Sequence, residues 1–201
     1  WAWRVVMEHF YQAIPGFLWF TECYRRLLRA LPSDTPSVFV ELGAFMGRST
    51  AWLGVEIVNS GKPVTLVTVD SFVSWEGDAS ILRGDALAEA FTRNTAPLVQ
   101  ALNGRFRPVR SDTRLAAQQF ADCSVDVVFV DAGHGYEDVS ADIEAWWPKI
   151  KPGGWMAGDD FMMRPVAQAV CERFAPDYIL VHGWTDNPVS QPWPSWMVRR
   201  A

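Results

Sequence analysis

The feature that most limits the fold of this chain is a regular alternation of two kinds of segment. Short runs of β-branched and other apolar residues, typical of strands buried on both faces, recur between longer stretches with helical spacing. The expected strands are residues 38–42, 64–70, 106–112, 125–131, 155–161, 178–184 and 196–200. The expected helices are residues 49–59, 85–102, 113–120, 136–150 and 166–174. This order predicts strand–helix–strand units with right-handed crossovers and a mostly parallel sheet.

The fold class expected from this pattern is α/β, with a Rossmann-like, doubly wound, seven-stranded and mostly parallel sheet that carries helices on both faces. Residues 1–34 precede it and contain apolar positions at mixed three- and four-residue spacing, broken at Pro15-Gly16. They predict two short helices that form an N-terminal cap. Residues 37–201 form the expected core, and 201 residues are compatible with a single domain.

Composition excludes several classes of function. The formal charge of −5 and the scattered basic pairs oppose general binding to nucleic acid, which needs clustered Lys and Arg. No apolar run approaches the roughly 18 residues that span a bilayer, so no membrane association is expected. The three cysteines include no CxxC pair, which argues against a zinc knuckle or a disulfide framework. The first thirty residues lack the order of a signal peptide, and the expected location is the cytoplasm.

The loop after the first expected strand reads ELGAFMGRS, from Glu41 to Ser49. Gly43 and Gly47 allow a tight turn and a close approach of the backbone to a ligand. Phe45 stands where a dinucleotide fingerprint would have a glycine that serves a pyrophosphate. The loop therefore favours a ligand without phosphate, which describes S-adenosylmethionine better than NAD. A plain strand-to-helix turn is the alternative interpretation.

Asp70 ends the second expected strand, 23 residues beyond Gly47. A carboxylate at this position can accept hydrogen bonds from both hydroxyls of a ribose. Aspartate is also a favoured helix N-cap, which is the alternative. The combination of this carboxylate with the preceding glycine loop favours the nucleoside interpretation.

Three further aspartates end the fourth and fifth expected strands, namely Asp131, Asp159 and Asp160. These strands are neighbours, about 4.8 Å apart, in a doubly wound sheet, so the carboxylates can converge. Such a cluster raises the pKa of its own members unless a cation compensates it, and oxygen ligands suit Mg²⁺. The alternative is that Asp131 and Asp160 cap the following helices.

His134 follows Asp131 by three residues, on the loop expected to overhang the metal. An imidazole titrates near neutral pH and can take a proton from a substrate, although many loop histidines only form hydrogen bonds. A separate hypothesis concerns four of the eleven tryptophans that fall outside the best periods, some of which are expected to line an acceptor pocket: Trp75, Trp184, Trp193 and Trp196.

Three segments together resemble a known family: VELGAFMGRST, the VD at Asp70 followed by WEGD, and VDAGHGYEDVSADIEAWWPKIKPGGWMAGDDF. They are similar to class I methyltransferases of the small bacterial group that includes macrocin-type sugar O-methyltransferases and their catechol O-methyltransferase-like relatives. The resemblance covers residues 38–174. Catechol-type relatives have a lysine base three residues after the metal-binding aspartate, where this chain has His134.

The resemblance implies roles for particular residues. The methyl donor would be held by Glu41, Gly43, Gly47 and Asp70, with Ser111 or Asp112 near its adenine, and Ser49, Ser71 and Asp131 are counted with this group. Asp131, Asp159 and Asp160 would bind Mg²⁺ or another divalent cation, with His134 and Asp131 as the candidate catalytic residues.

The function expected from these observations is metal-assisted methyl transfer from S-adenosylmethionine to a hydroxyl of a small acceptor such as a sugar, diol or polyphenol. Three alternatives stay open: a metal-independent or nitrogen-directed methyltransferase, a non-catalytic adenosylmethionine-binding module and, more remotely, a dehydrogenase. The expected partner is the small hydroxylated acceptor, and a homo-oligomer is left open.

Overall fold

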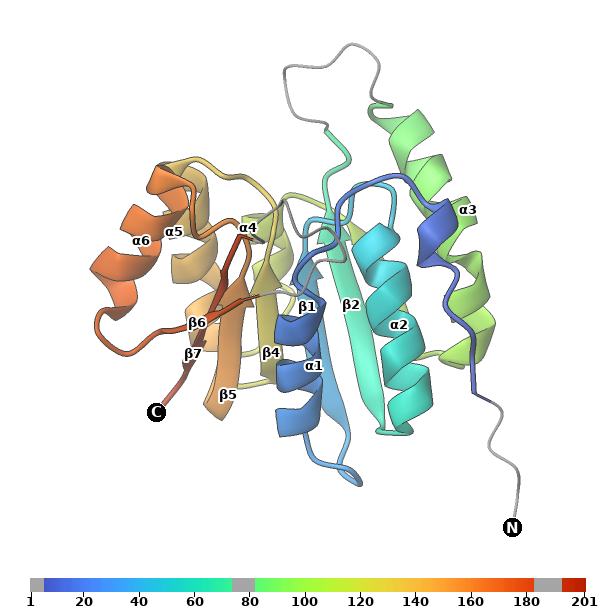
Figure 1. The fold of residues 1–201 in the computed structure, drawn as a ribbon, viewed down its shortest axis with the longest axis horizontal. Coiled ribbons are helices and arrows are strands. Elements are labelled where there is room, and N and C mark those ends of the chain that lie inside the picture. Colours follow the sequence, from blue (N-terminus) through green and yellow to red (C-terminus); the bar gives the residue numbers. More distant parts are fainter. Residues whose placement is uncertain (1–5, 74–81, 183–192) are drawn as a thin grey trace.

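The computed structural model describes residues 6–73, 82–182 and 193–201, and its centre is a seven-stranded sheet (Figure 1). The strand order is β3-β2-β1-β4-β5-β7-β6. All neighbours pair in parallel except β7, which is antiparallel to both β5 and β6. The strands are β1 (Ser37–Leu42), β2 (Val64–Asp70), β3 (Phe106–Arg110), β4 (Val125–Val130), β5 (Ile150–Gly158), β6 (Ile179–Val181) and β7 (Ser195–Arg199). The predicted fold class is thereby confirmed.

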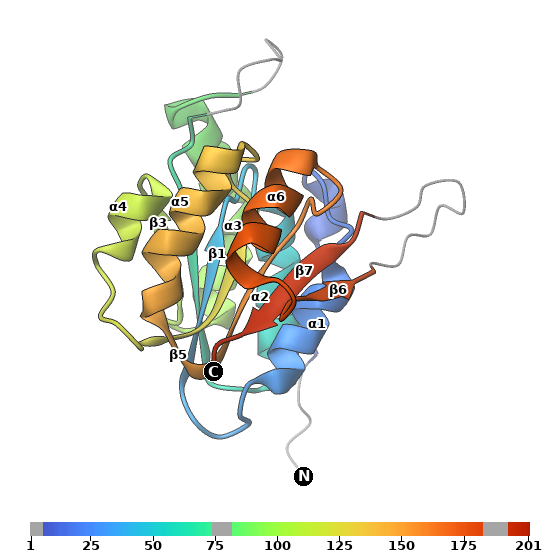
Figure 2. The same ribbon diagram turned by 90° about the vertical axis from the view of Figure 1, so that its left-hand side faces the viewer.

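Helices cover both faces of the sheet (Figures 1 and 2). One layer contains α1 (Thr21–Ala30), α2 (Arg48–Ser60) and α3 (Asp85–Ala101), and the other contains α4 (Thr113–Ala117), α5 (Tyr136–Trp146) and α6 (Arg164–Phe174). Short 3₁₀ turns occur at η1 (Tyr11–Ala13) and η2 (Trp147–Lys149). Each layer packs on the sheet through its own cluster of buried side chains, as expected for strands that are apolar on both faces.

The N-terminal segment differs from the expected cap in one respect. From residue 6 onward, where the structure describes this segment, the first predicted helix corresponds only to the turn η1, whereas the second is the full helix α1. The apolar face of α1 includes Tyr24, Leu27 and Leu28, which belong to the same buried cluster as strand residues such as Phe39. Helix α1 is therefore a member of the helix layer, and only the residues before it cross the upper edge of the sheet (Figure 1).

The fifth strand begins earlier than its sequence suggests. Pro152-Gly153-Gly154 reads as a turn, but β5 begins at Ile150, and its pairing with β4 shifts between Val125 and Val127. The shift accommodates Gly153, whose φ of +79° interrupts a regular strand. The predicted helix up to residue 150 accordingly ends at Trp146, because Pro148 cannot continue it.

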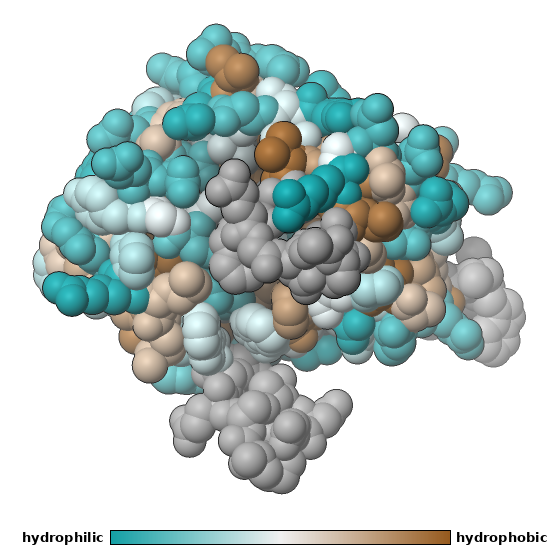
Figure 3. All heavy atoms as spheres, turned by 90° about the horizontal axis from the view of Figure 1, so that it is seen from above, coloured by the Kyte–Doolittle hydropathy of each residue, from teal (hydrophilic) through white to brown (hydrophobic). Residues whose placement is uncertain are grey.

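The carboxyl ends of the parallel strands meet at one face of the molecule, where the loops that carry the predicted site residues also lie (Figure 1). Seen from above, this face has hydrophobic side chains at its centre next to hydrophilic ones (Figure 3). Among the described residues, no helix is both long and apolar enough to cross a membrane.

Candidate active site

Gly43 brings the end of β1 against the end of β4. Its φ is +88°, and a Cβ at this position would lie 1.9 Å from the backbone oxygen of Asp131. Its N–H donates to Val69 O of β2 at 2.8 Å. The glycine is therefore required by packing between backbones, in addition to any approach by a ligand.

Gly47 ends the same loop and is the N-cap of α2, with φ +89°. A Cβ here would lie 2.7 Å from Cγ2 of Thr95 on α3, so α2 and α3 leave no room for a side chain. Asn94 Nδ2 donates to Met46 O at 2.8 Å, which further fixes the loop to α3. The shape of the loop from Gly43 to Gly47, called the donor loop below, is thus set by its contacts with α3.

The side chain of Glu41 lies inside the fold. It is fully buried and accepts hydrogen bonds from the hydroxyls of Tyr24 (2.8 Å), Thr50 (2.6 Å) and Thr68 (3.1 Å). Burial raises its pKa, although these bonds and one from Ser49 oppose the shift. The carboxyl group of Glu41 therefore connects α1, α2 and β2 within the fold, with Ser49 beside it. The roles of both residues toward the donor stay predictions.

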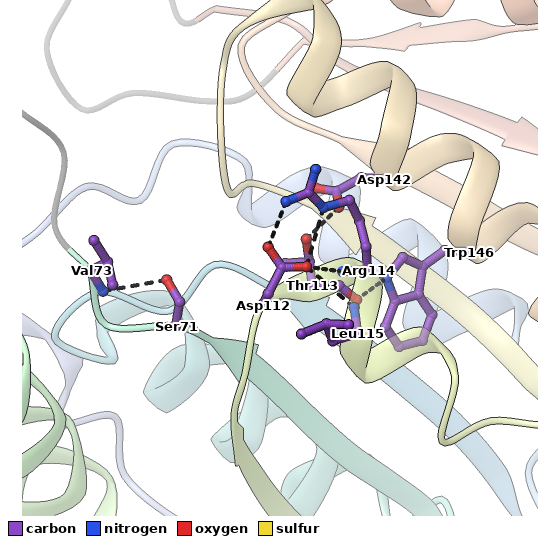
Figure 4. Close-up of polar contacts among 8 residues, drawn as sticks. All are labelled: Ser71, Val73, Asp112, Thr113, Arg114, Leu115, Asp142 and Trp146. Atoms are coloured by element: carbon purple, nitrogen blue, oxygen red, sulfur yellow. Dashed lines mark hydrogen bonds and ion pairs between the residues drawn. The ribbon is translucent and has the colours of Figure 1, made fainter.

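Asp70 binds the donor loop directly. Its Oδ2 accepts the backbone N–H of Ala44 at 2.7 Å and of Phe45 at 2.9 Å, and its Oδ1 accepts that of Phe72 at 2.6 Å. It does not cap a helix, since α3 begins only at Asp85. Ser71 follows it and accepts a hydrogen bond from Val73 N–H at 3.3 Å (Figure 4). Asp70 therefore fixes the loop on which a donor ribose is expected.

Ser111 follows β3, and its N–H donates to Asp70 O at 3.0 Å. Asp112 comes next in the chain (Figure 4). Asp112 is the N-cap of α4 and accepts hydrogen bonds from the N–H groups of Arg114 and Leu115. The Arg114 guanidinium, whose Nη2 lies 2.8 Å from Asp112 Oδ2, lowers the pKa of the Asp112 carboxyl group. The structure thus gives Asp112 a capping role, and its predicted place beside adenine stays a prediction.

A buried carboxyl group of α5 holds the start of α4, directly after Asp112. Asp142 of α5 is 2% exposed and accepts a hydrogen bond from the Thr113 hydroxyl, while Trp146 Nε1 donates to Thr113 O at 3.0 Å (Figure 4). Burial raises the pKa of Asp142 to about 6, and the negative charges of Asp112 and Asp138 add to the shift. Helix α5 therefore holds the first residue of α4 through a group whose ionisation is unfavourable in the folded protein.

We expect Asp142→Asn to stabilise the protein at alkaline pH. A folded-state pKa of about 6 against an ordinary 3.8 means that the folded state binds this proton more tightly, so wild-type stability falls as pH rises through that interval. The amide keeps an oxygen for Thr113 without the charge. The free energy of unfolding in urea should rise by about 1–3 kcal/mol at pH 8 relative to wild type, and by much less at pH 4.5. Asp122→Asn, on an exposed side chain that does not act on Asp142, is the control, and an equal change in stability at both pH values would contradict the prediction.

The acidic half of the site lies at the ends of β4 and β5. Asp131, His134 and Asp160 each offer one ligand atom within 4.8 Å of the others. His134 Nε2 lies 2.8 Å from Asp160 Oδ2 and 3.7 Å from Asp131 Oδ1. Neither aspartate caps a helix, because α5 begins after Gly135 and α6 after Met163. The capping alternative is therefore excluded for both.

The third expected metal ligand, Asp159, is directed elsewhere. Its Oδ2 accepts the indole N–H of Trp19 at 2.5 Å, and its Oδ1 accepts the hydroxyl of Ser195 at 3.1 Å. Asp160 has a left-handed backbone (φ +56°), which breaks the alternation of the strand and separates the two consecutive carboxyl groups. In this arrangement His134 completes the convergent group in place of Asp159.

These groups strongly alter one another's protonation. The nearby carboxylates of Asp131 and Asp160 raise the pKa of His134 to about 10. Burial raises the pKa of Asp131 to about 6, with Asp160 adding to the shift and His134 opposing it. Burial and the charges of Asp131 and Asp160 raise the pKa of Asp159 to about 8. At neutral pH the His134 imidazolium therefore balances the carboxylates, and the neutral form of Asp159 is favoured.

The tryptophan hypothesis is wrong for Trp196. This residue is fully buried, packs 6.1 Å from the ring of Phe174 and contacts Gly158, so it cannot line a pocket. Trp193 is 44% exposed, which keeps its role a prediction. Trp75 and Trp184 lie outside the described residues, as does the WEGD segment. Trp19 could not be predicted as a site residue, since nothing in the spacing of the N-terminal segment indicates contact with a residue 140 positions away.

The fold and these strand ends define the class of protein: a class I, S-adenosylmethionine-dependent methyltransferase. Residues 40–161, more than half of the chain, match the methyltransferase domain family, and the chain belongs to that family. A stretch of 118 residues is 33% identical to the uncharacterized protein y4gI of Sinorhizobium fredii, covering 58% of this chain but only 12% of that protein. The chain thus spans about an eighth of the length of this relative.

Two solved structures illustrate the shared fold. The O-methyltransferase NovP is 20% identical with a TM-score of 0.62, over 90% of this chain and 78% of that one. The TDP-rhamnose 3′-O-methyltransferase CalS11, an enzyme in calicheamicin biosynthesis, is 18% identical with a TM-score of 0.54, over 89% and 77%. At these identities the likeness shows the fold alone, since one fold can support many chemistries.

Proposed function

We propose that this methyltransferase transfers the methyl group of S-adenosylmethionine to a hydroxyl of a small acceptor, such as a sugar, a diol or a polyphenol, with the help of a divalent cation. The observation that carries the proposal is the convergence of Asp131, His134 and Asp160 beside the donor loop. NovP and CalS11 are both O-methyltransferases by name, and CalS11 acts on a sugar nucleotide, which supports a hydroxylated acceptor here.

The residues present fit a divalent cation. The Asp131 and Asp160 carboxylates, which lie within 4.8 Å of each other and of His134, supply oxygen ligands of the kind that Mg²⁺ or Mn²⁺ prefers. Asp131 and Asp160 would hold the ion, and Asp159 could join them only by giving up Trp19 or Ser195. When bound, such an ion lowers the pKa of a coordinated acceptor hydroxyl and stabilises the alkoxide.

The residues of the chain would perform the remaining steps. Gly43 and Asp70 fix the donor loop and the end of β2, and with them the position of the sulfonium methyl group relative to the acceptor. His134, on a side chain that is 40% exposed, takes the proton of the acceptor hydroxyl at Nε2. It can do so only in its neutral form, so the charges of Asp131 and Asp160 must be compensated by another cation.

A metal-free methyltransferase is the second candidate function. One observation favours it: His134 Nε2 lies 2.8 Å from Asp160 Oδ2 and 3.7 Å from Asp131 Oδ1, so a protonated imidazole can itself balance the two carboxylates. In that case His134 would orient the acceptor by donating a hydrogen bond, and the proton would leave to water. Methyl transfer assays with and without chelator separate the two candidates, with the methylated product identified as an ether or an amine.

Donor binding gives a direct test of the nucleoside half of the site. S-adenosylhomocysteine should bind in calorimetric titration, and Asp70→Asn should weaken its binding by about 1–3 kcal/mol through loss of a charged acceptor for the ribose hydroxyls. The amide oxygen can still accept the N–H groups of Ala44 and Phe45, but the amide NH2 would face the N–H of Phe72, so the melting temperature is measured alongside. Asp122→Asn, on an exposed side chain paired with Lys149, is the control. Equal affinity in wild type and Asp70→Asn would remove the ribose role.

A further inference from the structure

The segment Ile14–Trp19 connects the two halves of the site. Arg48, at the start of α2, donates to Ile14 O at 2.8 Å, and a Cβ built on Gly16 would lie 3.5 Å from the ring of Phe45 in the donor loop. At its other end, Trp19 Nε1 donates to Asp159 Oδ2 at 2.5 Å, next to the acidic cluster. In Figure 1 the chain before α1 crosses above the sheet in this region. The segment thus runs from the donor loop to the carboxylates, which is where an acceptor must lie for in-line transfer.

Two aromatic side chains of this segment are placed differently. Trp19 packs partly into the core cluster of the α1 side and is oriented by its hydrogen bond to Asp159. Phe17 is 72% exposed and contacts only Trp19 among the aromatic residues described, with ring centroids 5.3 Å apart and planes tilted by 45°. Burial in the fold therefore accounts for Trp19 in part but not for Phe17.

On the basis of the proposed function, we infer that Phe17 and Trp19 form the wall that recognises the ring of the acceptor. The acceptor is a cyclic vicinal diol: its hydroxyls face Asp131, His134 and Asp160, and its apolar ring packs against the two mutually tilted aromatic rings. Trp19 is a positioning residue, because its indole N–H on Asp159 fixes the angle of the wall relative to the carboxylates. Aromatic faces pack equally well against a planar ring and against the C–H face of a sugar.

A binding experiment on the S-adenosylhomocysteine complex tests the wall without requiring turnover. The probes are catechol, an aromatic diol, and methyl α-L-rhamnopyranoside, a sugar diol, each added with Mg²⁺. In ¹H–¹⁵N spectra the indole signal of Trp19 is assigned as the one lost in Trp19→Phe among the eleven tryptophans. We expect this signal to shift with at least one probe and Phe17→Ala to weaken that probe about threefold to tenfold. The responding probe identifies the ring as aromatic or sugar.

Two further variants separate recognition from folding. Phe17→Tyr keeps the ring and should restore binding, whereas Val99→Ala truncates another exposed apolar side chain (62%) on α3 and should change nothing. In turnover, Phe17→Ala should raise KM for the acceptor while leaving KM for the donor and the melting temperature unchanged. An unmoved Trp19 signal with both probes, or equal probe affinity in Phe17→Ala, would overturn the inference. Probe binding at Trp19 without methyl transfer would instead overturn the proposed function and leave the wall in place.

Discussion

Asp160→Asn should lower kcat for methyl transfer by at least about a hundredfold while changing the affinity for S-adenosylhomocysteine by less than about threefold. The reason is positional. Asp160 Oδ2 lies 2.8 Å from His134 Nε2 and belongs to the convergent group with Asp131, whereas no described contact joins its side chain to the donor loop. Asp160→Asn therefore removes a negative charge that is needed to bind the cation, and it leaves the donor-binding half of the site intact. Single-turnover kinetics and calorimetric titration measure the two quantities separately.

Chelation tests the same prediction without mutation. EDTA should reduce the wild-type rate to a level near that of Asp160→Asn, and Mg²⁺ or Mn²⁺ should restore it only in the wild type. Asp159→Asn is the matched comparison, since its carboxyl group binds Trp19 and Ser195, and we expect a smaller loss of kcat than for Asp160→Asn. Full activity in EDTA together with normal turnover by Asp160→Asn would favour the metal-free candidate.

The sheet could be predicted from the sequence because its strands are buried on both faces and read as continuous apolar runs. Val64–Asp70 has the predicted bounds, and Ser37–Leu42 differs from its prediction by one residue. The predicted strand bounds are wrong where the local sequence is compatible with both a turn and a strand. Pro152-Gly153-Gly154 resembles a turn but lies inside β5, because pairing with β4 continues across an irregularity that no local pattern specifies.

The candidate site could be predicted only as far as strand ends determine it. The positions of Asp70, Asp131 and Asp160 follow from the rule that ligand residues lie at the carboxyl ends of parallel strands. The directions of side chains do not follow from that rule. Asp159 and Asp160 are adjacent in sequence, yet the left-handed backbone at Asp160 sends them to different partners. Glu41 likewise belongs to the donor motif but is enclosed by three hydroxyl groups.

The protonation state of His134 depends on the two carboxylates beside it and decides whether it can act as a base. Its pKa is raised from an ordinary 6.5 to about 10 by Asp131 and Asp160, so the protonated form is favoured in the folded protein. The stability that this ion pairing contributes is fully present below pH 6.5 and is lost as pH rises through about 10. In this form the imidazole cannot accept a proton at neutral pH. For His134 to act as a base, another positive charge must therefore neutralise the two carboxylates.

His134→Ala should lower kcat by about 10² to 10⁴ at pH 7 if the imidazole is the base, and the loss should shrink as pH rises and the acceptor ionises unaided. His134→Gln, which keeps a polar side chain of similar length, should be equally impaired. NMR titration of the three histidines supplies the direct measurement. The His134 signal should titrate near pH 10 in EDTA and at a clearly lower pH with saturating Mg²⁺. An unchanged titration in Mg²⁺, with His134→Gln retaining most of the activity, would contradict the role of His134 as base. The protonated His134 would then only balance the charge of the two carboxylates, and the acceptor would lose its proton to water.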